Sequence, residues 1–177
     1  MDAIKKSYAD TSGGQIHYRY LAGRGTPIVF LHQTASSSAM YLKLMARLEG
    51  VGPLYALDTP GFGASFEPDG MPPLTQYVQW LAEAIEALGL KRFHLLGHHT
   101  GAFIACELAA RYPDSAVAGP IRLLGIRARS PRLLELQKSA AYALTADSDG
   151  DLAATLAGHR LSAVVLCAAL IKPVHAA

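Results

Sequence analysis

Short apolar stretches separated by polar turns run through the first two thirds of the chain and predict strands. Residues 15–21 alternate isoleucine and tyrosine with polar residues, which predicts a half-buried edge strand. Residues 27–31 form a continuous apolar run, which predicts a central strand buried on both faces. Similar stretches at residues 54–57, 93–96 and 121–126 predict three more strands.

Apolar residues at helical spacing lie between these strands. One stripe, within residues 40–48, follows three serines that suit helix caps. Residues 75–90 repeat apolar side chains at helical intervals, and Gly89 marks the end of the helix that they predict. Residues 102–112 predict another helix, stopped by Pro113. Strands that alternate with helices predict an α/β fold with a mostly parallel sheet.

The last third of the chain has a different pattern. Residues 130–143 open with a Ser-Pro pair, which suits the cap and first turn of a helix. Residues 145–151 are polar and predict a loop, and residues 152–171 are mostly helix-forming. The apolar run at 161–171 is about half as long as a membrane span and predicts a buried helix. No strand is expected after Ile126.

Length and composition fit a single domain over residues 1–177, with 51% hydrophobic residues to form its core. The formal charge is only +2 and no basic stripe is present, so a nucleic-acid partner is not expected. Cys106 and Cys167 lie far apart, and no apolar signal core precedes the first predicted strand. These features favour a reducing, cytoplasmic setting without membrane attachment.

Three polar residues, His32, Asp58 and His99, each follow the end of a predicted strand. The carboxyl ends of parallel strands meet at one edge of a sheet, so we expect these side chains at a common rim. His17 and His94 lie within predicted strands. They are expected to be ordinary strand residues, either solvent-facing or hydrogen-bonded.

Residues 97–101 (GHHTG) follow an apolar run and open a helix-like segment. Their spacing is that of a nucleophile elbow, a strained strand-to-helix turn that projects its middle side chain above the sheet. His99 occupies the position at which a serine is expected. Imidazole acts readily as a base or hydrogen-bond donor near neutral pH, and it is a less usual group for holding a covalent acyl intermediate.

Three motifs occur in order: residues 30–34 (FLHQT), 57–65 (LDTPGFGAS) and 95–101 (LLGHHTG). With them the chain resembles the α/β-hydrolase superfamily over about residues 8–127, and more narrowly a bacterial subgroup with histidine at the elbow. The resemblance implies that the segment after the first central strand forms part of an oxyanion hole. It also implies that residues 58–65 shape the neighbouring rim.

One departure from the superfamily pattern lies beside this expected oxyanion hole. Many members have glycine after the first histidine, whereas this chain has Gln33, which reduces backbone freedom and adds a polar amide. Backbone N–H groups near Thr34 and Thr100 are still expected to stabilise an anion. Together with Gln33 they are the predicted substrate-binding residues.

A second departure is length. Members of the superfamily complete a triad with an acid and a histidine after later strands, and each strand–helix unit needs about 30 residues. Residues 128–177 are too few for two such units and a lid, and the histidines there, His159 and His175, follow no predicted strand. We expect this segment to be a divergent, truncated or mis-framed second half. If residues 131–171 are native, their helices are expected where the cap domain lies in relatives.

The acid that would orient His99 is not identified by a motif. Asp58 is the nearest candidate, because it too follows the end of a predicted strand. The weaker candidates lie in the polar loop: Asp147, Asp149 and Asp151.

Other interpretations of these residues are less favoured. Thr100 and the serines at 36–38 are candidate nucleophiles, but helix capping is the favoured role for both. A metal site formed by His32, His98 and His99 matches no known ligand spacing, so neither a metal nor another cofactor is expected.

The sequence therefore favours an enzyme that acts on a small ester- or carbonyl-containing molecule. His99 would be the base, and backbone amides near Thr34 and Thr100 would stabilise the oxyanion. A competing hypothesis is an inactive hydrolase-like fragment or a module that binds a ligand or partner. A third is a homodimer, paired through C-terminal helices, that completes the site.

Overall fold

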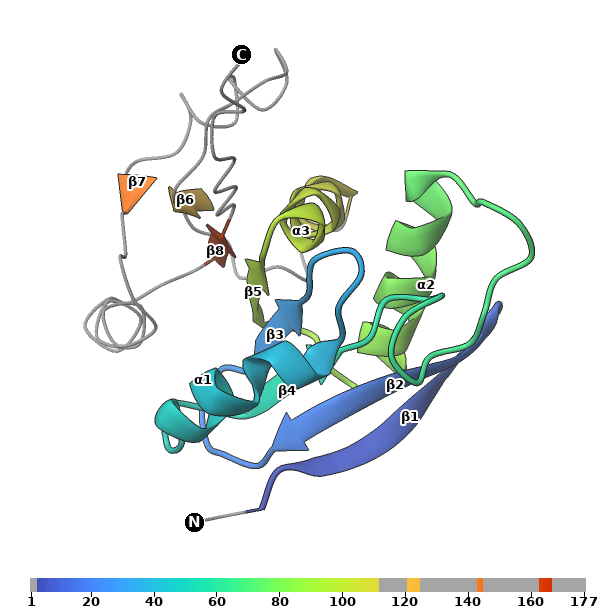
Figure 1. Cartoon of the computed structure of the whole chain (residues 1–177). Coiled ribbons are helices and arrows are strands. Elements are labelled where there is room, and N and C mark those ends of the chain that lie inside the picture. Colours follow the sequence, from blue (N-terminus) through green and yellow to red (C-terminus); the bar gives the residue numbers. More distant parts are fainter. Residues whose placement is uncertain (1–2, 112–120, 125–142, 145–162, 167–177) are drawn as a thin grey trace, which may run out of the picture.

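A computed structural model describes residues 3–111, 121–124, 143–144 and 163–166. A five-stranded sheet forms the main body, and its strand order is β1-β2-β4-β3-β5 (Figure 1). The strands are β1 (Lys5–Thr11), β2 (Gly14–Leu21), β3 (Ile28–Leu31), β4 (Leu54–Leu57) and β5 (His94–Gly97). The strands β4, β3 and β5 are parallel, while β1 and β2 join them in antiparallel pairs.

Helices cover both faces of this sheet. The short 3₁₀ helix η1 (Ser38–Tyr41) and α1 (Leu42–Arg47) pack on one face, and α2 (Leu74–Ala87) and α3 (Thr100–Arg111) pack on the other (Figure 1). Side chains of a strand point alternately to the two faces. In β3, Val29 therefore joins the core beneath α2 and α3, whereas Phe30 joins the core beneath α1.

The helix α2 ends where its sequence predicts. Its buried residues recur at helical spacing: Val78, Leu81, Ala84 and Ile85. Gly89 takes a φ of +70° and its N–H bonds to the Glu86 carbonyl, while the Leu90 N–H bonds to Ile85. This paired arrangement satisfies the last carbonyls of the helix and favours glycine at the left-handed position.

The hairpin formed by β1 and β2 is held against α2 by its turn. The Ser12 N–H donates to the Glu83 carboxylate at 2.8 Å. A Cβ added to Gly13 would collide with the rings of Trp80 and Phe66, which themselves pack edge to face. The turn must therefore carry a glycine where it crosses the helix.

The sequence pattern does not predict the strand β1, and its presence corrects the expectation that residues 15–21 form the edge strand. β2 lies between β1 and β4, so β1 is the edge. On the face of β1 toward α2 the side chains are small or polar, and Ala9 is the apolar residue buried there. An alternation this weak in hydrophobicity gives little strand signal.

The C-terminal third also differs from expectation. A second sheet has the order β7-β6-β8, with β6 (Ile121–Leu124), β7 (Ala143–Leu144) and β8 (Ala163–Leu166) running parallel. The strand predicted at 121–126 is thus confirmed over its described residues, 121–124, but the expectation of no later strand is wrong. The helix predicted over 161–171 is wrong at 163–166, because a short apolar run with two adjacent valines suits a parallel strand.

Most of the remaining C-terminal predictions lie outside the described residues. These are the greater part of the helix at 130–143, the loop at 145–151, and the late histidines and aspartates. Among the helices that the structure describes, none combines the length and the apolar character needed to cross a membrane.

Candidate active site

Three parallel strands end side by side at what we call the carboxyl edge of the sheet. Leu31, the last residue of β3, lies opposite Leu57 at the end of β4 and Gly97 at the end of β5. The His98 N–H extends this pairing by donating to the Leu31 carbonyl at 3.0 Å. The segments that contain His32, Asp58 and His99 therefore leave the sheet together, as the alternation of strands and helices predicts.

The turn between β5 and α3 holds His99 in a left-handed conformation. Its φ is +52°, and the side chain is exposed. The next N–H groups, those of Gly101 and Ala102, already donate to the carbonyls of His98 and His99. Few residues other than glycine adopt such a conformation, and it persists only where the surroundings enforce it.

The surroundings of this turn require glycine on both sides of it. A Cβ on Gly97 would collide with the backbone of Gly101, and a Cβ on Gly101 would collide with the carbonyl oxygen of Leu31. The two glycines let the start of α3 approach the ends of β3 and β5 closely. The turn is thus fixed by packing of backbone on backbone.

A pair of threonines joins this turn to the loop after β3. The Thr34 N–H donates to the Thr100 hydroxyl oxygen at 2.5 Å, and the two hydroxyls lie 2.8 Å apart. The Thr100 hydroxyl therefore bonds to the neighbouring loop, which is not the helix-capping role expected of it. The Thr34 N–H, expected as an oxyanion donor, is engaged by this hydroxyl.

His32 is buried, and both of its ring nitrogens are engaged. Nε2 accepts the Thr59 N–H at 2.9 Å, which places the ring proton on Nδ1, and Nδ1 donates to the Gln33 carbonyl at 2.7 Å. Burial lowers the pKa of His32, although the Gln33 carbonyl and Asp58 favour the charged form. In this arrangement a neutral His32 connects the loops that follow β3 and β4, and Phe62 packs edge-on against its ring.

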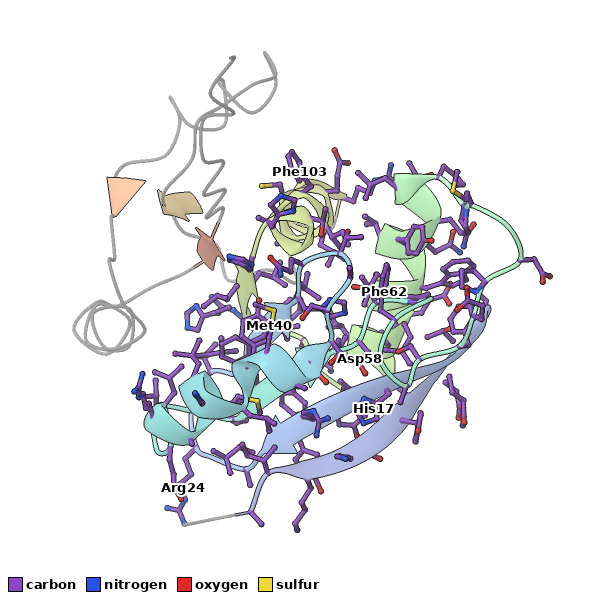
Figure 2. The ribbon with its side chains drawn as sticks, viewed as in Figure 1. His17, Arg24, Met40, Asp58, Phe62 and Phe103 are labelled. Atoms are coloured by element: carbon purple, nitrogen blue, oxygen red, sulfur yellow. The ribbon has the colours of Figure 1, made fainter. Side chains whose placement is uncertain are left out.

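Asp58 is also buried and joins several segments. Oδ1 accepts the Ser38 N–H at 2.5 Å, and Oδ2 accepts the Ala64 N–H at 3.0 Å. Oδ2 also lies 2.7 Å from His17 Nδ1 (Figure 2). Burial raises the pKa of Asp58, but these hydrogen bonds outweigh it and leave the pKa below its ordinary value.

The partner of Asp58 is therefore His17, whereas the sequence pattern suggests His99 for that place. His17 is only 3% exposed. Its strand is expected from the sequence to have one solvent face, but β2 lies inside the sheet and is covered on both sides. Within the motif at 57–65, Gly63 is the sequence feature that could have indicated close packing of this loop around Asp58. A Cβ on Gly63 would collide with the Asp58 carboxylate.

The remaining predicted residues lie near the turn. Gln33 is half-buried, and Ala35, two residues later, has a φ of +60°. His98 is half-buried, and burial, together with the nearby His99, lowers its pKa. Within the described ranges, no three histidine, cysteine, aspartate or glutamate side chains gather closely enough to hold a metal ion.

Comparison with known proteins agrees with this architecture. A family model described as alpha/beta hydrolase fold matches residues 26–121. The chain belongs to the α/β-hydrolase family. Its mixed, mostly parallel sheet with helices on both faces is the fold of that family.

Haloalkane dehalogenases are among the similar proteins. One from Agrobacterium fabrum is 34% identical over 113 residues, which are 64% of this chain and 37% of the relative. The crystal structure of haloalkane dehalogenase DatA from Agrobacterium tumefaciens C58 has a TM-score of 0.63 at 30% identity, covering 77% of this chain and 48% of that one. Human 1-acylglycerol-3-phosphate O-acyltransferase ABHD5 is 35% identical over 93 residues, half of this chain and 27% of the relative. The chain thus spans less than half the length of these relatives.

Proposed function

We propose that this α/β-hydrolase-family chain hydrolyses a small ester or a related carbonyl compound, with His99 as general base. The observation that best supports the proposal is the conformation of His99. An imidazole is exposed at the carboxyl edge of a parallel sheet, on a left-handed turn enforced by two glycines. Strained backbone of this kind is concentrated at functional sites.

The proposed reaction needs no covalent enzyme intermediate. A water oxygen attacks the ester carbonyl carbon while His99 accepts a proton from that water. The carbonyl π electrons move to oxygen and give a tetrahedral oxyanion. Collapse of this intermediate breaks the bond to the alkoxy oxygen, which takes the proton from His99 and leaves as an alcohol, with a carboxylic acid as the second product.

The oxyanion would be stabilised at the start of α3. The Thr100 N–H lies in the first turn of the helix, where N–H groups have no intrahelical acceptor and the helix dipole favours negative charge. The Thr34 N–H becomes a second donor only when the Thr100 hydroxyl releases it. Alternatively, a hydroxyl could be the second donor. One hydroxyl proton lies in the hydrogen bond between Thr34 and Thr100, and the other hydroxyl proton can be donated to the oxyanion.

Replacing His99 tests the proposal directly. We expect His99→Ala to lower the rate of hydrolysis of responsive esters by at least about 100-fold, because general-base catalysis contributes on that scale. The panel should include small alkyl and aryl esters and one haloalkane, since several of the similar proteins are named haloalkane dehalogenases. His98→Ala is the matched control and should retain most of the activity. Equal rates in the wild type and His99→Ala would remove His99 from the mechanism.

A second experiment tests the absence of an acyl-serine step. A fluorophosphonate probe should not label the folded protein at the serines 36–38, which follow the loop after β3. Stoichiometric labelling there, identified by peptide mass spectrometry, would exclude the proposed mechanism.

A non-catalytic role is the second candidate, and the engagement of Asp58 by His17 favours it. A histidine base usually relies on an acid that orients it. The acid nearest to His99 by strand order is instead held by His17, Ser38 and Ala64. On this hypothesis the carboxyl edge binds a small ligand without turnover, so esters would raise the melting temperature and no product would form.

A further inference from the structure

The strand β1 is an unshared edge of the main sheet. In the part of the chain that the structure describes, β1 pairs with β2 alone. An edge strand presents backbone N–H and C=O groups that a further strand can bind.

The hairpin register determines which residues of β1 face outward. Thr11 lies opposite Gly14 across a two-residue turn, so these two residues form a hydrogen-bonded pair. Hydrogen-bonded pairs alternate along an antiparallel ladder, so Lys5, Ser7, Ala9 and Thr11 direct their backbone groups toward β2. The outward backbone groups therefore belong to the intervening residues, which are Lys6, Tyr8 and Asp10.

These three residues also share one face of the strand, because successive side chains alternate. Lys6 and Asp10 are exposed, and Tyr8 is 50% exposed. The outward edge thus has a cation at one end, an anion at the other and an aromatic ring between them. When a second copy of this strand runs antiparallel to the first, its aspartate can lie opposite the lysine of the first copy, and its lysine opposite the aspartate.

We propose that β1 pairs antiparallel with β1 of a second copy of this chain, with a twofold axis at Tyr8. This register places Lys6 opposite Asp10 of the second copy, and Asp10 opposite the second copy's Lys6. Each of these pairs, and the Tyr8 pair on the axis, joins residues whose backbone groups face outward, so each exchanges two N–H···O bonds. Opposite charges in directly opposed positions stabilise such a ladder.

The other twofold registers that match outward groups lack these two opposite-charge pairs. An axis at Ser7 or at Ala9 places Tyr8 opposite Lys6 or Asp10 of the second copy, respectively. An axis at Lys6 places two lysines opposite each other, and an axis at Asp10 does the same with two aspartates. Directly opposed like charges destabilise strand pairing. Charge therefore selects the register centred on Tyr8, and the two five-stranded sheets become one continuous sheet across the dimer.

Charge reversal on the full-length chain tests the inference. The association state is measured by sedimentation velocity from low micromolar to submillimolar concentration. We expect the wild type to form a reversible dimer that weakens as salt is added. Lys6→Glu, which places a carboxylate opposite Asp10 of the second copy, should raise the dissociation constant at least about tenfold. Asp10→Lys should act in the same way.

Two further variants separate this interface from a general effect of charge. The double variant K6E/D10K restores opposite charges in the register and should restore the dimer. Lys5→Glu makes the same charge change as Lys6→Glu, but Lys5 lies on the other face, opposite Thr11 of the second copy, and should leave the dimer intact. Circular dichroism should show that all four variants are folded.

Several outcomes would overturn the inference. These are a wild type that is monomeric throughout the series, a Lys6→Glu variant that dimerises normally, and a double variant that stays monomeric. A wild-type monomer that binds an extended segment of another protein along β1 would also overturn it, because the partner would then not be a second copy.

Discussion

Asp58 has a single carboxylate that holds three separate segments at the carboxyl edge. Its oxygens accept the N–H groups of Ser38 and Ala64 and pair with the ring of His17. A buried charge is expensive unless its partners replace the lost water, and here backbone and imidazole donors do so. Asp58 therefore anchors the loops that follow β3 and β4 to each other and to β2.

Replacing this anchor should destabilise the protein. Asp58→Asn removes the charge and turns an acceptor into an NH₂ group that faces existing donors. We expect the free energy of unfolding to fall by about 3 kcal/mol, the scale for losing hydrogen bonds to a buried charged group. Urea denaturation measures this change. Asp69→Asn, at an exposed carboxylate in the loop before α2, should change it by less than about 0.5 kcal/mol, and a similarly small loss at Asp58 would contradict the anchoring role.

His32 predicts a pH dependence of stability. Burial holds its pKa below the ordinary value of 6.5, so the unfolded chain binds a proton first as the pH falls. The free energy of unfolding should therefore decrease as the pH drops below about 6.5, until the folded-state pKa is passed. His32→Gln should flatten this dependence between pH 7 and about pH 5, as measured by urea denaturation at fixed ionic strength. An unchanged slope would show that His32 is not the responsible group.

At the scale of elements, the approach of α3 to β3 and β5 determines the shape of the candidate site. Gly101 lies against the Leu31 carbonyl, and this contact joins backbone to backbone. A larger residue at position 101 would therefore clash with that carbonyl, and no side-chain rotation could relieve the clash. The position of His99 thus depends on how closely a helix and a strand pack.

Gly101→Ala should test that packing. We expect a loss of about 1–3 kcal/mol in the free energy of unfolding, the usual cost of overpacking. Activity or ligand binding at His99 should also decline, because the turn must move. Phe103→Ala changes a partly exposed side chain of the same helix and serves as the control. An alanine variant as stable as the wild type would mean that α3 can shift freely.

The elements that can be predicted from the sequence are those with strong local signals. The apolar run of β3 and the spaced apolar residues of α2, closed by Gly89, need no knowledge of their neighbours. β1 escapes prediction because it has little apolar alternation, and its strand form depends on pairing with β2. The sequence of β8 predicts a helix because a short apolar run does not distinguish a strand from a buried helix.

At the scale of the whole molecule, topology explains which parts of the site can be predicted. Parallel strands bring His32, Asp58 and His99 to one edge of the sheet regardless of the contacts that their side chains make. This grouping can therefore be predicted from the sequence. The bonds themselves do not follow. Asp58 pairs with a histidine 41 residues away, and the Thr34 and Thr100 segments are 66 residues apart. Such pairings depend on side-chain direction and on which faces are covered.

The two cores share one sheet, so they should unfold together. Phe30→Leu weakens the core beneath α1, while the chain's single tryptophan, Trp80, lies against the other core. We expect this variant to lose about 1 kcal/mol of unfolding free energy. Tryptophan fluorescence and far-ultraviolet circular dichroism should shift to the same new midpoint. Separate midpoints would mean that the two faces unfold independently.

The turn at residues 12–13 is exposed at the surface, yet we expect its contacts with α2 to protect it from proteases. A protease needs several residues freed from their neighbours, and here the Ser12 N–H is bound to Glu83 while Gly13 lies against Trp80. Cleavage would require the hairpin to detach from α2. Met71, by contrast, is 98% exposed in the loop before α2. Limited digestion should therefore cut near Met71 before it cuts the hairpin turn.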